Sequence, residues 1–236
     1  MKMLRPLVVV ALLSMLGSAA QTVKNFELKD QSPPDCPIRI SAEIQFTEIV
    51  EDGKFKASYT EHFVTFNATD KAIVALVVVN HVANSYGPLV DESRLLDAFF
   101  AHDLEIPPME KHAHDHPTES GLFVENFRPN AKLGTPHAEG KVIFAQFADS
   151  SIWGDINDSR VQSLMSTREL ILQTINRLDE AASKGDDEFL KALAINSGNG
   201  DVDQTVLGHL RDFQKNRGNR YAKGMVKQML AIAASR

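Results

Sequence analysis

The period of the hydrophobic residues changes once along this chain, near Asn157, and that change decides the fold class. Before it, apolar residues recur at every second position or in short continuous runs, and after it they recur every three or four positions. The first pattern is typical of strands and the second of amphipathic helices. The sequence therefore predicts an α+β protein, with a β-rich domain over residues 38–157 and a helical segment over residues 158–236.

Two patterns predict the strands. From Ile38 to Phe46 apolar and polar residues alternate, as in a strand with one face on a core and one in water. The run from Ala72 to Val82 is almost continuously apolar and rich in β-branched residues, which predicts a strand buried on both faces. This density of short strands is typical of a β-sandwich. Further strands are expected over residues 55–66, 95–104, 123–127, 141–147 and 152–154.

The stretch from Phe63 to Lys71, followed by Ala72-Ile73-Val74, resembles the strand, polar turn, strand unit of immunoglobulin-like modules in exported bacterial proteins. The resemblance implies an N-terminal immunoglobulin-like antiparallel β-sandwich that binds or displays, and it implies no activity. The chain has one cysteine, so the antibody-type pair is absent, and Trp153 lies in the last expected strand. The implied sandwich is a divergent one without the disulfide.

Three to four short amphipathic helices are expected after the boundary. Asp158 or Ser159 can cap the first, and Gly218 precedes the last. Because a short helix must bury one face to be stable, the apolar stripes are interpreted as core. The stripe of the first helix consists of Val161, Leu164, Ile171, Ile175 and Leu178.

Residues 1–20 have the pattern of a cleavable export signal. Lys2 and Arg5 form a positive start, Leu7 to Leu16 an apolar stretch, and residues 17–20 a small-residue cleavage site. The apolar stretch is short of the about 20 residues that a membrane-spanning helix needs. We therefore expect a periplasmic or secreted protein with no integral membrane segment after cleavage, in which residues 21–37 form a polar, proline-rich linker.

Composition narrows the class of partner. Hydrophobic residues make up 43% and charged residues 24% of the chain, ordinary values for a water-soluble globular protein. The formal net charge is −6, and loss of Lys2 and Arg5 would make it −8, which argues against nucleic acid as a partner. The single cysteine, Cys36, excludes an intramolecular disulfide, so stability must come from packing.

The strongest chemical signal is the run His112-Ala113-His114-Asp115-His116. On a strand, His112, His114 and His116 would share one face, and imidazole nitrogens are good ligands for zinc, copper or nickel. His102 or His137 would supply a further ligand. The segment also suits an exposed hydrophilic loop, because it lies between Pro107-Pro108 and Pro117. A metal site, with zinc as the cofactor, and a plain loop are therefore alternative interpretations.

The sequence predicts no catalytic residue and no organic cofactor. It contains no G-x-S-x-G elbow, H-E-x-x-H, P-loop or glycine-rich dinucleotide turn, which favours a protein that is not an enzyme. A basic stretch is opposed only by Asp212, and it fits either an anionic lipid or polymer, or a solvated helix face. This stretch contains Arg211, Lys215, Arg217, Arg220, Lys223 and Lys227.

Two functions fit these observations. The first is an exported binding or structural module whose partner is an unknown protein or surface polymer. The alternative is a metal-binding protein or metal-dependent hydrolase that uses the histidine run at 112–116.

Overall fold

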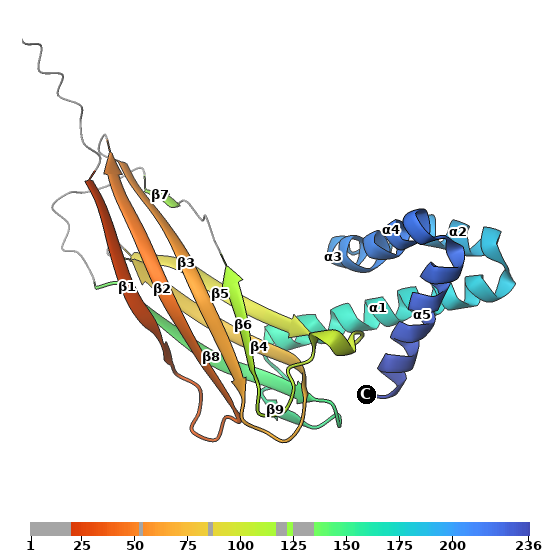
Figure 1. The fold of residues 1–236 in the computed structure, drawn as a ribbon, viewed down its shortest axis with the longest axis horizontal. Helices are drawn as coiled ribbons and strands as arrows, with labels where there is room; N and C mark the ends of the chain where they lie inside the picture. Colours follow the sequence, from red (N-terminus) through yellow and green to blue (C-terminus); the bar gives the residue numbers. More distant parts are fainter. Residues whose placement is uncertain (1–19, 52–53, 85–86, 117–121, 125–134) are drawn as a thin grey trace, which may run out of the picture.

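The computed structural model describes residues 20–51, 54–84, 87–116, 122–124 and 135–236. The protein is α+β, with a curled sheet followed by helices (Figure 1). The predicted change near Asn157 is confirmed, because β9 (Ile152–Gly154) is the last strand and α1 (Ser159–Lys184) begins directly after it. The predicted export signal lies outside the described residues, apart from Ala20.

The described part of the chain contains nine strands in one sheet. Their order is β5-β4-β8-β1-β2-β3-β6, with β7 paired to β3 and β9 paired to β8. The sheet curls into a half-barrel, and β5 and β6 form its two edges (Figure 1). The bounds are β1 (Ala20–Asp30), β2 (Ile38–Glu51), β3 (Lys54–Asn67), β4 (Ile73–Asn84), β5 (Gly87–Asp97), β6 (Lys111–His116), β7 (Leu122–Val124) and β8 (His137–Phe147).

The pairing of strand β1 shows that two predictions are wrong, the linker over residues 21–37 and the antiparallel sheet. It pairs antiparallel with β2 as far as Glu27 and then parallel with β8 from Leu28 to Asp30. The predicted linker over residues 21–37 is therefore wrong for its first part, and the sheet is mixed rather than antiparallel. The physical reason is long-range pairing: Phe26 stacks on Phe46 of β2 with ring centroids 5.4 Å apart, although β1 itself is mostly polar.

The immunoglobulin-like sandwich is not confirmed by this arrangement. The inner faces of β2 and β3 do pack against those of β4 and β8 around one apolar core, as two layers of a sandwich would. In this chain, however, β1 joins both halves into a single hydrogen-bonded sheet. The core contains Ile40, Ile44, Phe46 and Phe63 from one side and Leu76, Val78, Val142 and Phe147 from the other.

The prediction that Ala72 to Val82 forms a strand buried on both faces is confirmed. Leu76 and Val78 of β4 point into the half-barrel. Ala75 and Val77 point to the opposite face, where they pack with Val161 and other residues of α1. The first half of α1 thus covers the outer face of the sheet.

The remaining helices form a separate body, which we call the helical arm and define as residues 170–234. Its elements are the second half of α1, α2 (Asp186–Ala194), α3 (Gly200–Val202), a π-helical turn η2 (Asp203–Leu207), α4 (Gly208–Arg217) and α5 (Asn219–Ala234). At 26 residues α1 is longer than the short helices predicted, because it belongs to both bodies. The arm has its own apolar core, to which Phe100 alone of the described residues outside the arm contributes.

Asp158 caps α1 as predicted, since its side chain accepts a hydrogen bond from the backbone N–H of Arg160. The chain turns between α4 and α5 at Gly218, whose φ of 88° favours glycine. No helix within the described ranges is both long and apolar enough to cross a membrane.

Gly140 allows β8 to approach β1 and β2 closely. A Cβ atom at this position would lie 2.9 Å from side-chain atoms of Leu28, Ile40 and Asn80. Gly224 in α5 has the opposite environment, because a Cβ atom there would meet nothing within 4 Å beyond the backbone of its own helix. The two glycines are therefore a matched pair for the same substitution.

We predict that Gly140→Ala destabilises the protein by about 1–3 kcal/mol through overpacking. Gly224→Ala should instead stabilise it by about 0.5–1 kcal/mol, because alanine is the better helix former. Urea unfolding followed by circular dichroism measures both. Equal shifts for the two variants would contradict the close approach at Gly140.

Candidate functional site

The three histidines predicted to bind metal lie on a strand. In β6, His112 is paired with Thr65, His114 with Phe63 and His116 with Glu61 of β3. Directly paired positions of antiparallel strands share a face, and all three β3 partners are buried. The backbone therefore forms a strand rather than the alternative loop, and it places the three histidine positions on one face. The side chains of His114 and His116 lie outside the described residues.

The structure does not bring His102 and His137 together. His137 begins β8 opposite Ala83, near the end of β4. His102 lies in η1 (His102–Leu104), close to Ile106, which bridges Ile73 at the start of β4. Among the side chains that the structure describes, which exclude those of His114 and His116, no three His, Cys, Asp or Glu residues are grouped to hold a metal ion.

Each of these two histidines has a local contact of its own. The Nδ1 atom of His137 lies 3.0 Å from the Thr135 carbonyl oxygen. The Nδ1 atom of His102 lies beside Glu105 and 3.1 Å from Nη2 of Arg236. In both rings the recorded contact is made by Nδ1.

A buried ion pair inside the half-barrel was not predicted from the sequence. Arg94 of β5 donates to Glu61 of β3, and their side chains are 16% and 1% exposed. The guanidinium also lies 4.8 Å from the centre of the Phe63 ring. Because β5 is not a neighbour of β3 in the sheet, this pair spans the open side of the half-barrel.

Asn80 of β4 completes this polar group. With its amide oriented to satisfy both neighbours, its oxygen accepts from Nε of Arg94 at 2.7 Å and its nitrogen donates to the Val79 carbonyl at 3.3 Å. A buried charge without such partners would cost several kcal/mol. The arrangement is a buried, hydrogen-bonded ion pair that links β3, β4 and β5.

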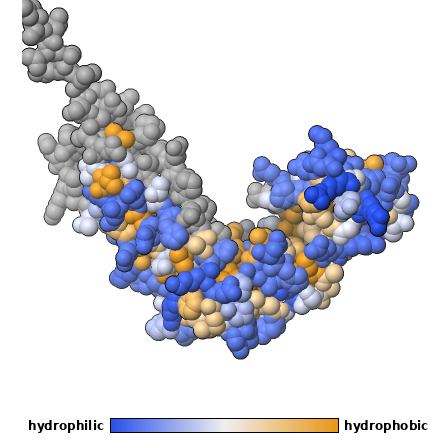
Figure 2. Space-filling model, in the orientation of Figure 1, coloured by the Kyte–Doolittle hydropathy of each residue, from blue (hydrophilic) through white to orange (hydrophobic). Residues whose placement is uncertain are grey.

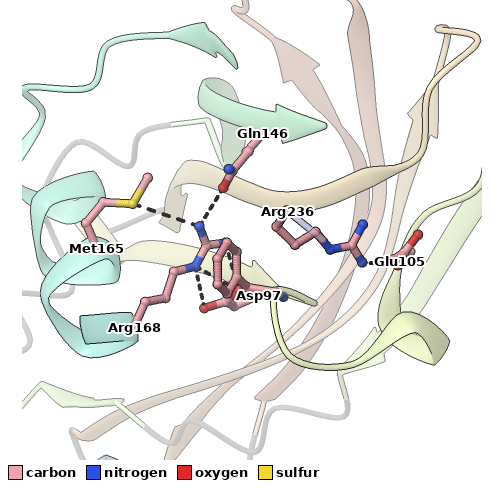
Figure 3. Close-up of polar contacts among 7 residues, drawn as sticks. Asp97, Glu105, Gln146, Met165, Arg168 and Arg236 are labelled. Atoms are coloured by element: carbon pink, nitrogen blue, oxygen red, sulfur yellow. Dashed lines mark hydrogen bonds and ion pairs between the residues drawn. The ribbon is translucent and has the colours of Figure 1, made fainter. Parts of the chain in front are cut away.

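A second buried arginine joins the arm to the sheet (Figure 3). Arg168, on α1, is 4% exposed and donates from Nε and Nη2 to Asp97 at the end of β5, with the shortest distance 2.8 Å. Its Nη1 donates to Oε1 of Gln146 on β8 at 2.5 Å. The guanidinium stacks 4.4 Å from the centre of the Phe99 ring. We call this group the Arg168 joint.

The signal for the joint was present in the sequence. Arg168 occupies the position between Leu164 and Ile171 in the apolar stripe of α1, so it is a charged residue on the buried face. Such a residue must meet a partner from another element. The partner could not be inferred, because Asp97 is 71 residues away in the chain.

The C-terminal residue makes a further contact between the two bodies (Figure 3). Arg236 donates to Glu105, and the two side chains are 4% and 15% exposed. Burial alone would raise the pKa of Glu105, but hydrogen bonds from Arg236 and His102 outweigh it, and the pKa lies below its ordinary value. Glu105 is therefore a carboxylate at neutral pH.

The lone thiol is not a nucleophile. Cys36 is 2% exposed and lies 3.2 Å from the Ile38 carbonyl oxygen. Burial raises the pKa of this thiol, so it is protonated at neutral pH. It is a small core residue.

Two of the six predicted basic residues serve the arm itself. Arg211 donates to the Leu193 carbonyl at 2.9 Å and to Asn196 at 2.8 Å. Lys223 donates to Asp186 at 2.6 Å and lies 5.5 Å from the centre of the Phe189 ring. The other four, Lys215, Arg217, Arg220 and Lys227, are exposed.

Comparison of the chain with protein-family models, with curated proteins and with solved structures gives no match.

We predict that Arg168→Met destabilises the protein by about 3 kcal/mol, because it leaves the carboxylate of Asp97 without its buried partner. Arg160→Met is the control in the same helix. Its partner Asp158 lies 3.6 Å away and Arg160 is 40% exposed, so the loss should be under about 0.5 kcal/mol. Urea unfolding measures the free energy of unfolding of both variants. Equal losses of stability would contradict a stabilising role of the Arg168 joint.

Proposed function

We propose that this protein is an exported binding module without catalytic activity, in which the sheet holds the helical arm in a fixed orientation and the arm contacts the partner. The observation that carries the proposal is the Arg168 joint. The arm has its own core, so its folding does not require an arginine buried against the sheet. Burying that charge costs desolvation energy, and the ordered contacts it makes fix the orientation of the arm.

The properties of the sheet edges favour the arm, rather than the sheet, as the surface that contacts the partner. Edge strands that do not receive partners are usually short or carry charges and proline. The edge strand β5 contains Pro88 and the inward-facing Arg94, and β6 has six residues. Both edges are thus poorly suited to adding a strand from another protein.

The proposed location is periplasmic or secreted, and it rests on the signal pattern of residues 1–20. The immunoglobulin-like resemblance stays a prediction that rests on the unit from Phe63 to Val74. Modules of that kind mostly bind or display, which agrees with the proposed role.

Photo-crosslinking in the exporting cell tests this proposal. We expect a photoreactive phenylalanine derivative at Tyr221, which is 58% exposed on the arm, to form adducts. The same group at Ile152, 48% exposed on β9, should form none. Arg168→Met should lower the yield from position 221, because the arm loses its orientation. Adducts only from position 152, or none from either position, would contradict the proposal.

A second candidate function is metal binding by His112, His114 and His116. The observation that favours it is the register of β6, which places these positions on one face and His116 opposite the carboxylate-bearing Glu61. Zinc, copper or nickel would suit imidazole ligands, and zinc with an open position would support hydrolysis.

Elemental analysis separates the two candidates. For the binding module we expect the untagged protein to hold no stoichiometric metal, and its stability to be unchanged by added zinc. Metal binding instead requires about one ion per chain, lost when His112, His114 and His116 are all replaced by alanine. That second result would overturn the first candidate in favour of the metal protein.

A further inference from the structure

Charge is distributed unevenly along this chain. Residues 208–236 contain seven Lys and Arg against one Asp, although the whole chain has a net charge of −6. Most of this segment is α4 and α5 of the helical arm. Figure 2 shows the most strongly hydrophilic side chains of this view on the helical arm. An acidic protein thus presents one basic region.

Four of these cations, which precede and follow the turn at Gly218, are what we call the basic face: Lys215 and Arg217 on α4, and Arg220 and Lys227 on α5. All four are exposed. None forms an ion pair with any residue in the described ranges, whereas the exposed Lys184 and Lys191 on the same arm are paired with Glu180 and Glu188. Asp212 is the one carboxylate on α4 and α5. The basic face is therefore available to an anionic partner.

Two exposed aromatic residues lie close to these cations in the chain, Phe213 on α4 and Tyr221 on α5. Phe213 is 38% exposed and Tyr221 is 58% exposed. The guanidinium carbon of Arg217 lies 6.0 Å from the centre of the Phe213 ring. Along α4, Phe213 also lines a shallow hollow with His209, Asp212, Asn216 and Arg217. Cations alone would bind any polyanion. Exposed aromatic rings beside them favour a partner whose surface has charged groups above an apolar layer.

We infer that the basic face binds the surface of a membrane that contains anionic phospholipid. Lys and Arg are attracted to the phosphate groups of such a surface, and rings of Phe and Tyr enter the boundary between headgroups and acyl chains. The inference rests on the proposed function, since it names the partner of the arm. In this arrangement the arm lies on the membrane surface, with its basic face toward the headgroups.

Vesicle sedimentation tests the inference. Residues 21–236, the chain expected after removal of the export signal, are mixed with vesicles of phosphatidylcholine alone or with vesicles in which a quarter of the lipid is phosphatidylglycerol. We expect binding only to the anionic vesicles, and weaker binding as salt rises. Each lysine or arginine removed should lower partitioning about fivefold, so replacing the four residues of the basic face with glutamine should abolish measurable binding.

The control variant removes the same number of exposed positive charges elsewhere, by replacing Lys29, Lys141, Lys184 and Lys191 with glutamine. It should bind anionic vesicles nearly as well as the unaltered protein. Circular dichroism and unfolding temperature confirm that both variants are folded. An equal loss in both would mean that only net charge matters, and would overturn the inference.

A pair of aromatic substitutions separates lipid from a soluble polyanion. Phe213→Ser with Tyr221→Ser should lower vesicle binding and leave binding to heparin unchanged. Binding to heparin without binding to anionic vesicles would overturn the membrane as partner. If vesicles are not bound but position 221 still crosslinks in the cell, the inference fails while the proposed binding module stands.

Discussion

The buried guanidinium of Arg168 is the most extensive polar contact between the arm and the sheet, and Arg236 adds a second contact through Glu105. Helix α1 belongs to two bodies: its first half lies on the outer face of the sheet, and its second half forms part of the arm's core. Arg168 lies between these halves and joins the end of β5 to β8 through Asp97 and Gln146. A guanidinium that donates two hydrogen bonds to one carboxylate has a fixed geometry. It therefore attracts Asp97 and also fixes the orientation of α1. The arm's direction in Figure 1 follows the continuous helix α1, and the contacts of Arg168 hold that helix against the sheet.

The Arg168 joint requires a sheet whose outer face has a fixed shape. Two features inside the half-barrel fix that shape. Gly140 lets β8 approach β1 closely, so that β1 can leave β2 and pair with β8. The buried pair of Arg94 and Glu61 then holds the open side of the half-barrel. Because β4 is packed on both faces, the outer surface that receives α1 is rigid. Sheet curvature, helix docking and arm direction are therefore one connected arrangement.

The sequence predicted those features that depend on residues close together in the chain. The boundary near Asn157, the cap at Asp158 and the two-sided burial of β4 all follow from residues adjacent in the chain. Strand β1 was missed because its neighbours β2 and β8 supply the pairing that its own polar sequence does not signal. The buried arginines were missed for a related reason: Arg94 and Arg168 have partners 33 and 71 residues away. For the histidine run, the sequence left a strand and an exposed loop as alternatives, and only the pairing with β3 decides for the strand.

If the Arg168 joint holds the arm at one orientation, the distance between the sheet and the arm has one value in every molecule. Spin labels at Ile152→Cys on β9 and Leu190→Cys on α2, with Cys36 replaced by alanine, report the separation of sheet and arm by pulsed electron resonance. The account predicts one narrow distance distribution, which becomes broad when Arg168 is replaced by methionine. A distribution that is already broad with Arg168 in place would contradict it.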